Sequence, residues 1–304
     1  MKDTLSGFLV IDKPEGITSF DVVARVRRAA LSIIGKPAFG EKKLRVGHLG
    51  TLDPLATGVL VVAVGDATKL IEYLMGEDKV YEAQIELGKI SDTYDKEGEI
   101  IVMQSAPTVS RDELESGLLL LVGEIQQVPP AFSAIKIEGR RAYDRARKGE
   151  IMVMEPRPVI VHSIKVRGFQ LPFVMLEIHC SSGTYIRSLA HDLGQNLGCG
   201  GLITALRRLR VGSFTLEQAI PFPESDFSDF EDHLIPLETV VQEWSSLVLV
   251  EEQIRSLQNG QPIFCPPGFS RINVDEPIAG FYQGKLVTLL KEEGRFMKSV
   301  KNFL

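Results

Sequence analysis

Short apolar runs alternate irregularly with helical patterns along this chain, and this arrangement constrains the fold more than any other feature. Strand-length apolar runs occur at 7–12, 59–64, 80–87, 159–166 and 173–179. Apolar residues at helical spacing occur between them, at 19–34, 66–75, 111–122 and 184–197. Because some strand-like runs are adjacent and others are separated by helices, we expect an α+β fold with a mixed sheet and not a regular doubly wound one.

Turn and cap residues give boundaries to several of these elements. The turn 13–16 closes the first strand, and Ser19 is predicted to cap the helix that follows, which should end at Gly35. Ser110 and Glu113 have the spacing of a capping box at the start of the helix at 111–122.

The charge of the chain is unevenly distributed. The 304 residues carry a net charge of -6, which would ordinarily argue against a nucleic-acid partner. However, residues 221–257 hold nine acidic side chains against one arginine. Residues 1–220 are neutral overall, with basic clusters at 136–148 and 207–210. These clusters predict either basic surface for a polyanion or merely solvated helix faces.

Length and composition divide the chain into three parts. A chain of this length favours one large and one small domain, and the acidic segment reads as the linker between them. We therefore expect a large domain at 1–220, an acidic linker at 221–246 and a small β-rich domain at 247–304.

Several classes of protein are excluded by missing signals. The apolar runs are far shorter than the roughly 20 residues of a membrane helix, and residues 1–12 lack a signal-peptide core. We therefore expect a cytoplasmic protein that does not bind membranes. Three dispersed cysteines predict neither disulfides nor a zinc site, and the sequence has no H-E-x-x-H, P-loop or G-x-G-x-x-G motif. We expect no cofactor and no metal.

The segment 45–60, RVGHLGTLDPLATGVL, stands out as a glycine-rich polar loop that runs into a buried strand. It holds His48, Thr51 and Asp53, the last of these directly before a proline. Asp53 could simply bond to its own backbone in an Asx-turn. It could equally act as a nucleophile or base at a sugar carbon. A glycosidase would need a second carboxylate, and none is close in sequence.

Five ordered stretches then carry a family resemblance, at 7–28, 46–70, 79–98, 126–150 and 181–214. They resemble the bacterial TruB tRNA pseudouridine synthases, which isomerise the T-loop uridine at tRNA position 55. Departures from the family pattern are Phe132, Ser91 and Gly201, none of them in the catalytic set. The resemblance implies a mixed, largely antiparallel catalytic sheet with a small β-rich, PUA-like domain at 247–304.

The resemblance also implies roles for individual residues. Asp53 matches the catalytic aspartate, Arg187 the arginine that pairs with it, and Tyr81 the active-site tyrosine. His48 matches the histidine that fills the gap left by a flipped base, and Tyr185 and Leu206 match uracil-pocket positions. Each residue also has a plainer interpretation. His48 could be a turn residue, Arg187 a surface arginine on a helix, and Tyr81 a core residue of a strand. Tyr185 and Leu206 could be helix core. Lys13 is expected to support the active-site loop.

The expected partner is tRNA, bound without a protein partner or guide RNA by a monomer. The segment 135–150 resembles the RNA-contacting insertion of the family, and its candidate phosphate ligands are Lys136, Arg140, Arg141 and Arg147. Two other functions stay open. One is a guide-dependent pseudouridine synthase, and the other is a tRNA-binding folding chaperone without catalysis.

Overall fold

The computed structural model describes residues 5–35, 43–103, 107–133, 136–137, 140–141, 154–222, 229–274 and 276–303. The residues predicted to contact RNA lie largely outside the described residues. The strands β8 (Lys136–Ile137) and β9 (Arg140–Arg141) pair with each other. Their side chains, and Arg147 altogether, lie outside the described residues.

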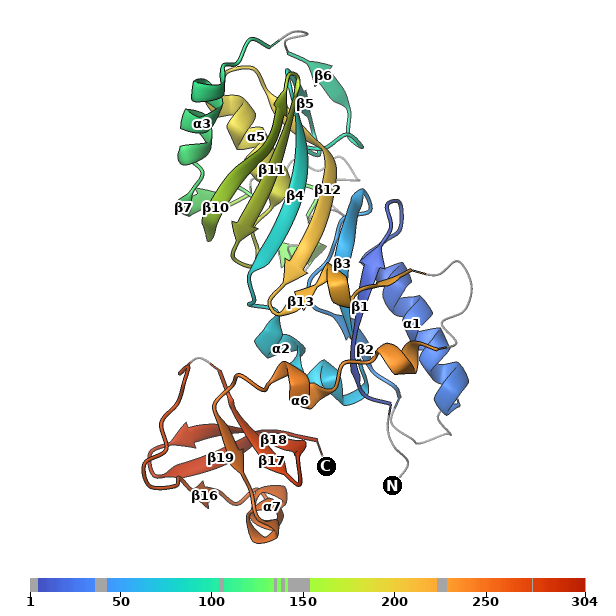
Figure 1. The fold of residues 1–304 in the computed structure, drawn as a ribbon, viewed down its shortest axis with the longest axis vertical. Helices are drawn as coiled ribbons and strands as arrows, with labels where there is room; N and C mark the ends of the chain where they lie inside the picture. The colour runs from blue at the N-terminus through green and yellow to red at the C-terminus, as the bar shows by residue number, and fades with distance from the viewer. Residues whose placement is uncertain are drawn as a thin grey trace.

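A ten-stranded mixed sheet forms the larger part of the molecule (Figure 1). Its central order is β14-β1-β3-β12-β4-β11-β10-β7, with β2 beside β3 and β13 beside β12. The pairs β1–β14 and β3–β12 are parallel, and the other pairs of this sheet are antiparallel. The prediction of a mixed, largely antiparallel sheet in an α+β fold is confirmed. The strands are β1 (Gly7–Lys13), β2 (Val46–His48), β3 (Ala56–Val64), β4 (Lys79–Leu87), β7 (Gly123–Gln127), β10 (Arg157–Gln170), β11 (Phe173–Cys180), β12 (Gly201–Val211), β13 (Phe214–Thr215) and β14 (Ile220–Pro221).

Three amphipathic helices pack on one face of this sheet and enclose its main core. They are α1 (Ser19–Ile34), α3 (Arg111–Leu119) and α5 (Ile186–Asn196). Side chains such as Val26, Leu114 and Leu189 meet alternate residues of β3 and β4 there. Alternation along a strand sends every second side chain to one face, so Leu60 and Val62 join this core while Val59 and Val61 join a second core on the opposite face.

The helix boundaries confirm most predictions and correct three. The capping box of Ser110 and Glu113 is present, although α3 ends at Leu119. The cap of α1 is Thr18 and not Ser19, because Thr18 and Asp21 form the capping box. The hydroxyl of Ser19 instead donates to the carbonyl of Leu52, a long-range contact that sequence spacing cannot show. The segment 66–75 divides into a 3-10 helix, η1 (Gly65–Leu70), and the short α2 (Ile71–Leu74).

A separate five-stranded sheet lies near the C-terminus (Figure 1). Its order is β15-β17-β18-β19-β16, and α7 (Glu251–Gln258) packs against its core. The second core continues from the large sheet into this one, since Val61 and Trp244 share it with Leu289. The strands are β15 (Ser246–Val248), β16 (Ile263–Phe264), β17 (Ile278–Tyr282), β18 (Lys285–Glu293) and β19 (Phe296–Asn302).

The acidic segment between the sheets contributes to both cores. It contains η3 (Phe230–His233) and α6 (Leu237–Val240). Phe230 is buried in the main core, and Leu237, Val241 and Trp244 are buried in the second. This segment therefore fixes the smaller sheet against the larger one. None of the helices in the described residues is long and apolar enough to span a membrane.

Candidate active site

The loop that carries Asp53 lies between β2 and β3 and is held by backbone contacts. The hydroxyl of Ser19 accepts from the Leu52 amide at 2.9 Å and donates to its carbonyl at 3.1 Å. The Gly16 amide donates to the Pro54 carbonyl at 2.8 Å, and the Ala56 amide donates to the Asp53 carbonyl at 3.0 Å. The aspartate is thus presented on a rigid turn whose supports come from the N-terminal strand and helix.

Lys13 supports the same loop through its ammonium group. Its buried ammonium donates to the carbonyls of Pro14, Ile17 and Pro54 at 2.9, 2.8 and 3.2 Å. Burial lowers the pKa of Lys13 to about 8, and the negative charge of Asp53 opposes this shift. Lys13 is therefore a positioning residue, as the sequence predicts.

Arg208 supports the other side of the loop, and its burial removes this one arginine from the basic surface predicted at 207–210. Its side chain is 1% exposed, and its guanidinium donates to the carbonyls of Val59, Gly50 and Thr51 at 2.7, 3.1 and 3.4 Å. A buried guanidinium must satisfy its donors, and carbonyls of the loop and of β3 accept them here. The neighbouring Arg207 forms an ion pair with Asp12 at 2.7 Å.

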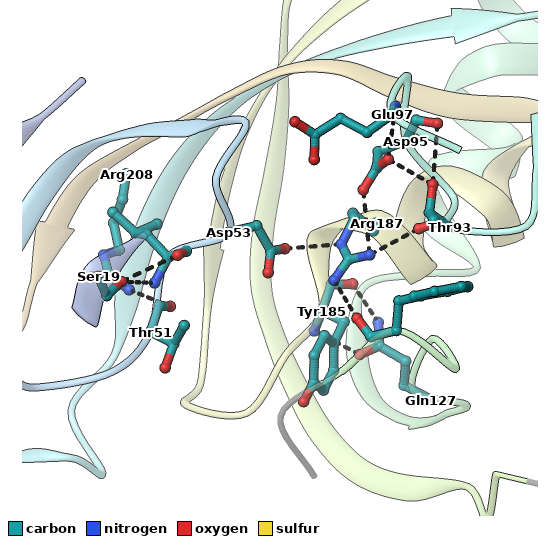
Figure 2. A network of polar contacts seen from close by, with 12 residues as sticks. Ser19, Thr51, Asp53, Thr93, Asp95, Glu97, Gln127, Tyr185, Arg187 and Arg208 are labelled. Atoms are coloured by element: carbon teal, nitrogen blue, oxygen red, sulfur yellow. Dashed lines mark hydrogen bonds and ion pairs between the residues drawn. The ribbon is translucent and has the colours of Figure 1, made fainter. Parts of the chain in front are cut away.

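Arg187 joins Asp53 to a second carboxylate (Figure 2). Its Nε lies 2.9 Å from Oδ2 of Asp53, and its Nη1 lies 3.3 Å from Oδ2 of Asp95. Nη1 and Nη2 also donate to the carbonyls of Thr93 and Phe132, each at 2.9 Å. The Arg187 side chain is 5% exposed, so it is not a surface arginine. The pairing of Asp53 with Arg187 was expected from the family resemblance.

Asp95 is the residue of this network that the sequence analysis did not single out. It is buried, and its Oδ1 accepts from the Thr93 hydroxyl at 2.6 Å and from the Glu97 amide at 3.0 Å. Asp53, in contrast, has a 36% exposed side chain. Of the two carboxylates on Arg187, Asp95 is thus the fixed one and Asp53 the accessible one. The signal for Asp95 was its place in the matched stretch 79–98.

A cavity of about 450 Å³ opens beside Asp53. Asp53, Tyr81, Tyr185, Arg187 and Leu206 all line it, so five of the six residues predicted for catalysis and uracil binding come together. Their elements are the loop before β3, strand β4, the start of α5 and strand β12. Leu206 is in a strand, which corrects the alternative of helix core.

Two tyrosines form part of the cavity wall. Tyr81 lies opposite Arg208 in the β4–β12 register, and burial raises the pKa of the Tyr81 hydroxyl, which therefore stays protonated near neutral pH. Tyr185 precedes α5, and the Gln127 side chain bonds both its amide and its carbonyl, at 2.8 and 3.0 Å. Burial also raises the pKa of Tyr185.

His48 lies outside the cavity, and Lys79 is a further residue of its wall. His48 ends β2 opposite Val62 and is not among the described residues that line the cavity. Lys79, which sequence reasoning missed, does line it and donates to the carbonyls of Met75 and Glu77. Burial lowers the pKa of Lys79 to about 8.

Comparisons with known proteins show which family the chain resembles. Residues 36–186 match the model of the TruB family pseudouridylate synthase N-terminal domain, and residues 187–242 match the tRNA pseudouridylate synthase B C-terminal domain. The tRNA pseudouridine synthase B of Clostridium kluyveri is 39% identical over 301 residues, covering 99% of this chain and 100% of that protein. The enzyme of the same name from Thermobifida fusca is 50% identical over 226 residues, covering 72% of this chain and 73% of that protein.

Solved structures share the fold. A crystal structure of a Cbf5-Nop10-Gar1 complex contains a chain 25% identical to this one, with a TM-score of 0.70 over 98% of this chain and 85% of that chain. An H/ACA RNP bound to a substrate RNA contains a chain 23% identical, with a TM-score of 0.69 over 99% and 86%. With its near full-length relatives and its Asp53–Arg187 pair, the chain belongs to the TruB family of pseudouridylate synthases.

Proposed function

We propose that this protein is a tRNA pseudouridine synthase that isomerises the T-loop uridine at tRNA position 55. The observation that carries the proposal is Asp53, accessible from the cavity and paired with the buried Arg187. The curated relatives bear the name tRNA pseudouridine synthase B. The reaction exchanges a C1′–N1 bond for a C1′–C5 bond within one nucleotide, so it needs neither an oxidant nor a second substrate.

Asp53 acts as the nucleophile in this mechanism. Its carboxylate attacks C1′ of the ribose or promotes departure of the uracil, which rotates and rejoins through C5. The Arg187 guanidinium pairs with this carboxylate and fixes its direction. Because Oδ2 is the oxygen paired with Arg187, we assign the attack to Oδ1.

Tyr81, Tyr185 and Leu206 shape the space for the detached uracil. An aromatic ring offers a stacking face, and the apolar side chain of Leu206 limits the water that can compete for C1′. Tyr81 keeps its proton near neutral pH because burial raises its pKa. Its hydroxyl can therefore donate a hydrogen bond to a uracil carbonyl. The proton that C5 releases to water is balanced by the proton that N1 takes up once it has left the ribose.

Access to Asp53 requires the uridine to leave the T-loop stack, at a cost of a few kcal/mol. His48 is assigned to fill the gap, since it lies just before the loop that carries Asp53. Lys136, Arg140, Arg141 and Arg147 are assigned to tRNA phosphates, and the domain at 247–304 to a PUA-like contact with the acceptor arm. We propose that the protein acts in the cytoplasm as a monomer, without a guide RNA.

The test is to incubate purified protein with unmodified T-arm RNA and map pseudouridine. We expect product from the wild type and none from Asp53→Asn, which keeps the shape of the side chain but loses its charge. Asp112→Asn, a change on the solvent side of α3, is the matched control and should keep full activity. No product from the wild type, or undiminished product from Asp53→Asn, would refute the mechanism.

The likeness to the Cbf5 chain favours one second candidate, a guide-dependent synthase. The same assay separates the two functions because it contains neither guide RNA nor partner protein. Modification by the purified chain alone excludes the guide requirement. A wild type that binds tRNA tightly and never modifies it would instead indicate the chaperone.

A further inference from the structure

Two histidines and an aspartate converge on the face of the large sheet opposite the catalytic cavity. Nε2 of His162 lies 2.9 Å from Oδ2 of Asp78, and Nε2 of His179 lies 3.4 Å from the same oxygen. The two imidazole rings have centroids 4.6 Å apart. Within the part of the chain that the structure describes, this is the one group of three such residues whose ligand atoms lie within 4.8 Å of one another.

Strand register explains how these three side chains meet. His179 pairs with Val80, and Tyr81 pairs with Ile178. Successive side chains alternate between faces, so His179 points away from the cavity that Tyr81 lines. The register of β10 on β11 shifts between Val161 and Ser163, which makes His162 the extra residue of a β-bulge. A bulge re-aims its side chain, and here it directs His162 toward Asp78.

The spacing suits a transition metal. Zinc binds histidine nitrogen and carboxylate oxygen at roughly 2.0 to 2.2 Å, which places tetrahedral ligand atoms about 3.3 Å apart. The distances from the Asp78 oxygen to the two nitrogens, 2.9 and 3.4 Å, bracket that value. The three side chains are 33 to 40% exposed, so water can supply a fourth ligand.

Arg210 lies beside this group of side chains. Its Nη2 lies 3.4 Å from Nε2 of His179, and its Nη1 donates to the Gly212 carbonyl at 3.3 Å. The positive charge of Arg210 is therefore close to the candidate ligand atoms and repels a cation bound between them.

We propose that Asp78, His162 and His179 form a binding site for a divalent transition metal, of which Zn²⁺ is the best match. Two imidazoles and a carboxylate also suit Ni²⁺ and Co²⁺ and disfavour Mg²⁺. The ion fastens together β10, β11 and the residue before β4. Since β11 leads into residues 181–187 of the cavity wall, the ion stabilises the sheet behind the active site and takes no part in the chemistry.

The experiment titrates metal-stripped, full-length protein with Co²⁺ and follows its visible absorption. Zn²⁺ is then measured by displacement of Co²⁺ and by the rise in Tm, since a ligand that binds only the folded state stabilises it. We expect saturable one-to-one binding to the wild type. The variants His162→Gln, His179→Gln and Asp78→Asn should each weaken it at least about tenfold, and Arg210→Gln should strengthen it.

Two control variants test whether histidine or cysteine side chains outside this site bind the metal. His233→Gln removes an exposed histidine elsewhere, and Cys265→Ser removes a partly exposed thiol; both should bind Co²⁺ as the wild type does. Circular dichroism verifies that each variant is folded. The proposal is overturned if the wild type shows no saturable Co²⁺ absorption, or if the folded ligand variants bind as tightly as the wild type. Neither result depends on whether the protein modifies tRNA.

Discussion

At the scale of single residues, the asymmetry of the two carboxylates on Arg187 organises the active site. Asp95 is buried and accepts from Thr93 and Glu97, whereas Asp53 reaches the cavity. A guanidinium held by a buried carboxylate has a fixed direction, and it fixes in turn the direction of the more exposed Asp53 carboxylate. We therefore expect Asp95 to act on catalysis through Arg187 and not by contact with the substrate.

The first prediction concerns Asp95→Asn. The amide keeps the size of the side chain but loses the charge that fixes Arg187, so Asp53 is presented less accurately. We expect kcat to fall by about a hundredfold while KM for tRNA stays within about twofold, as single-turnover and steady-state assays can measure. Asp95→Glu should recover part of kcat because it restores the charge. Equal losses in Asp95→Asn and Asp95→Glu would argue against charge as the cause.

The second prediction is a pH dependence of stability set by Asp192. Burial raises the pKa of Asp192 to about 6, from an ordinary value of 3.8. Between these values the folded state binds more protons than the unfolded state, so the contribution of this residue to stability decreases as pH rises from about 4 to 6. The side chain is only partly buried, so we expect a loss of about 1 kcal/mol.

Denaturation of the wild type and Asp192→Asn from pH 4 to 7 measures this contribution. The wild type should lose stability relative to the variant as pH rises through the window. A constant difference between the two proteins would show that Asp192 does not titrate there.

At the scale of elements, sequence periodicity predicted where the strands and helices lie, but it did not predict which residues they bring into contact. The runs at 59–64 and 80–87 became β3 and β4 with boundaries within a few residues, because each is a local pattern of burial. Arg208 was misjudged as basic surface because local charge does not show which carbonyls a folded chain brings to an arginine. Asp95 and the Asp78–His162–His179 group were missed for the same reason: their members are distant in sequence.

The third prediction concerns the parallel pairing of β3 and β12 at Gly58. Gly58 has a φ of +97°, and a Cβ there would lie 2.2 Å from the carbonyl oxygen of Arg208. Gly58→Ala must therefore separate the strands that hold the Asp53 loop, at a cost of at least about 3 kcal/mol. Gly16→Ala is the matched control, because Gly16 has a φ of +89° but no heavy atom within 4 Å of an added Cβ.

Urea denaturation of both variants separates two contributions to the loss of stability: the steric contact with β12 and the strain of a positive φ. Gly16→Ala should cost only about 1 kcal/mol. Equal losses in the two variants would mean that φ alone, and not the contact with β12, requires glycine at position 58.

At the scale of the whole molecule, the smaller sheet is joined to the catalytic part by apolar and polar contacts. Trp244 packs edge-on against Tyr73 within the shared core. Lys301 pairs with Glu72 at 2.7 Å, and Lys69 donates to the Asn302 carbonyl at 2.6 Å. These contacts tie the last strand to the η1–α2 segment next to the cavity. A tRNA held by the smaller domain would thus be held at a set distance from Asp53.

The last prediction follows from the uneven charge of the chain. A net charge of -6 repels tRNA at long range, so binding depends on local basic clusters. Changing Arg140, Arg141 and Arg147 together to Ala should weaken tRNA binding. It should also reduce the slope of log K against log salt by about two to three, at roughly 0.7 to 0.9 for each phosphate contact.

The matched control neutralises the acidic segment instead. Glu231→Gln with Asp232→Asn, both exposed on η3, should leave the salt slope unchanged, because we expect this segment to face away from the bound tRNA. Filter binding across a salt series measures both variants. A slope that stays at the wild-type value in the triple arginine variant would remove these residues from the phosphate contacts. A slope that changes in the acidic variant would place that segment at the RNA.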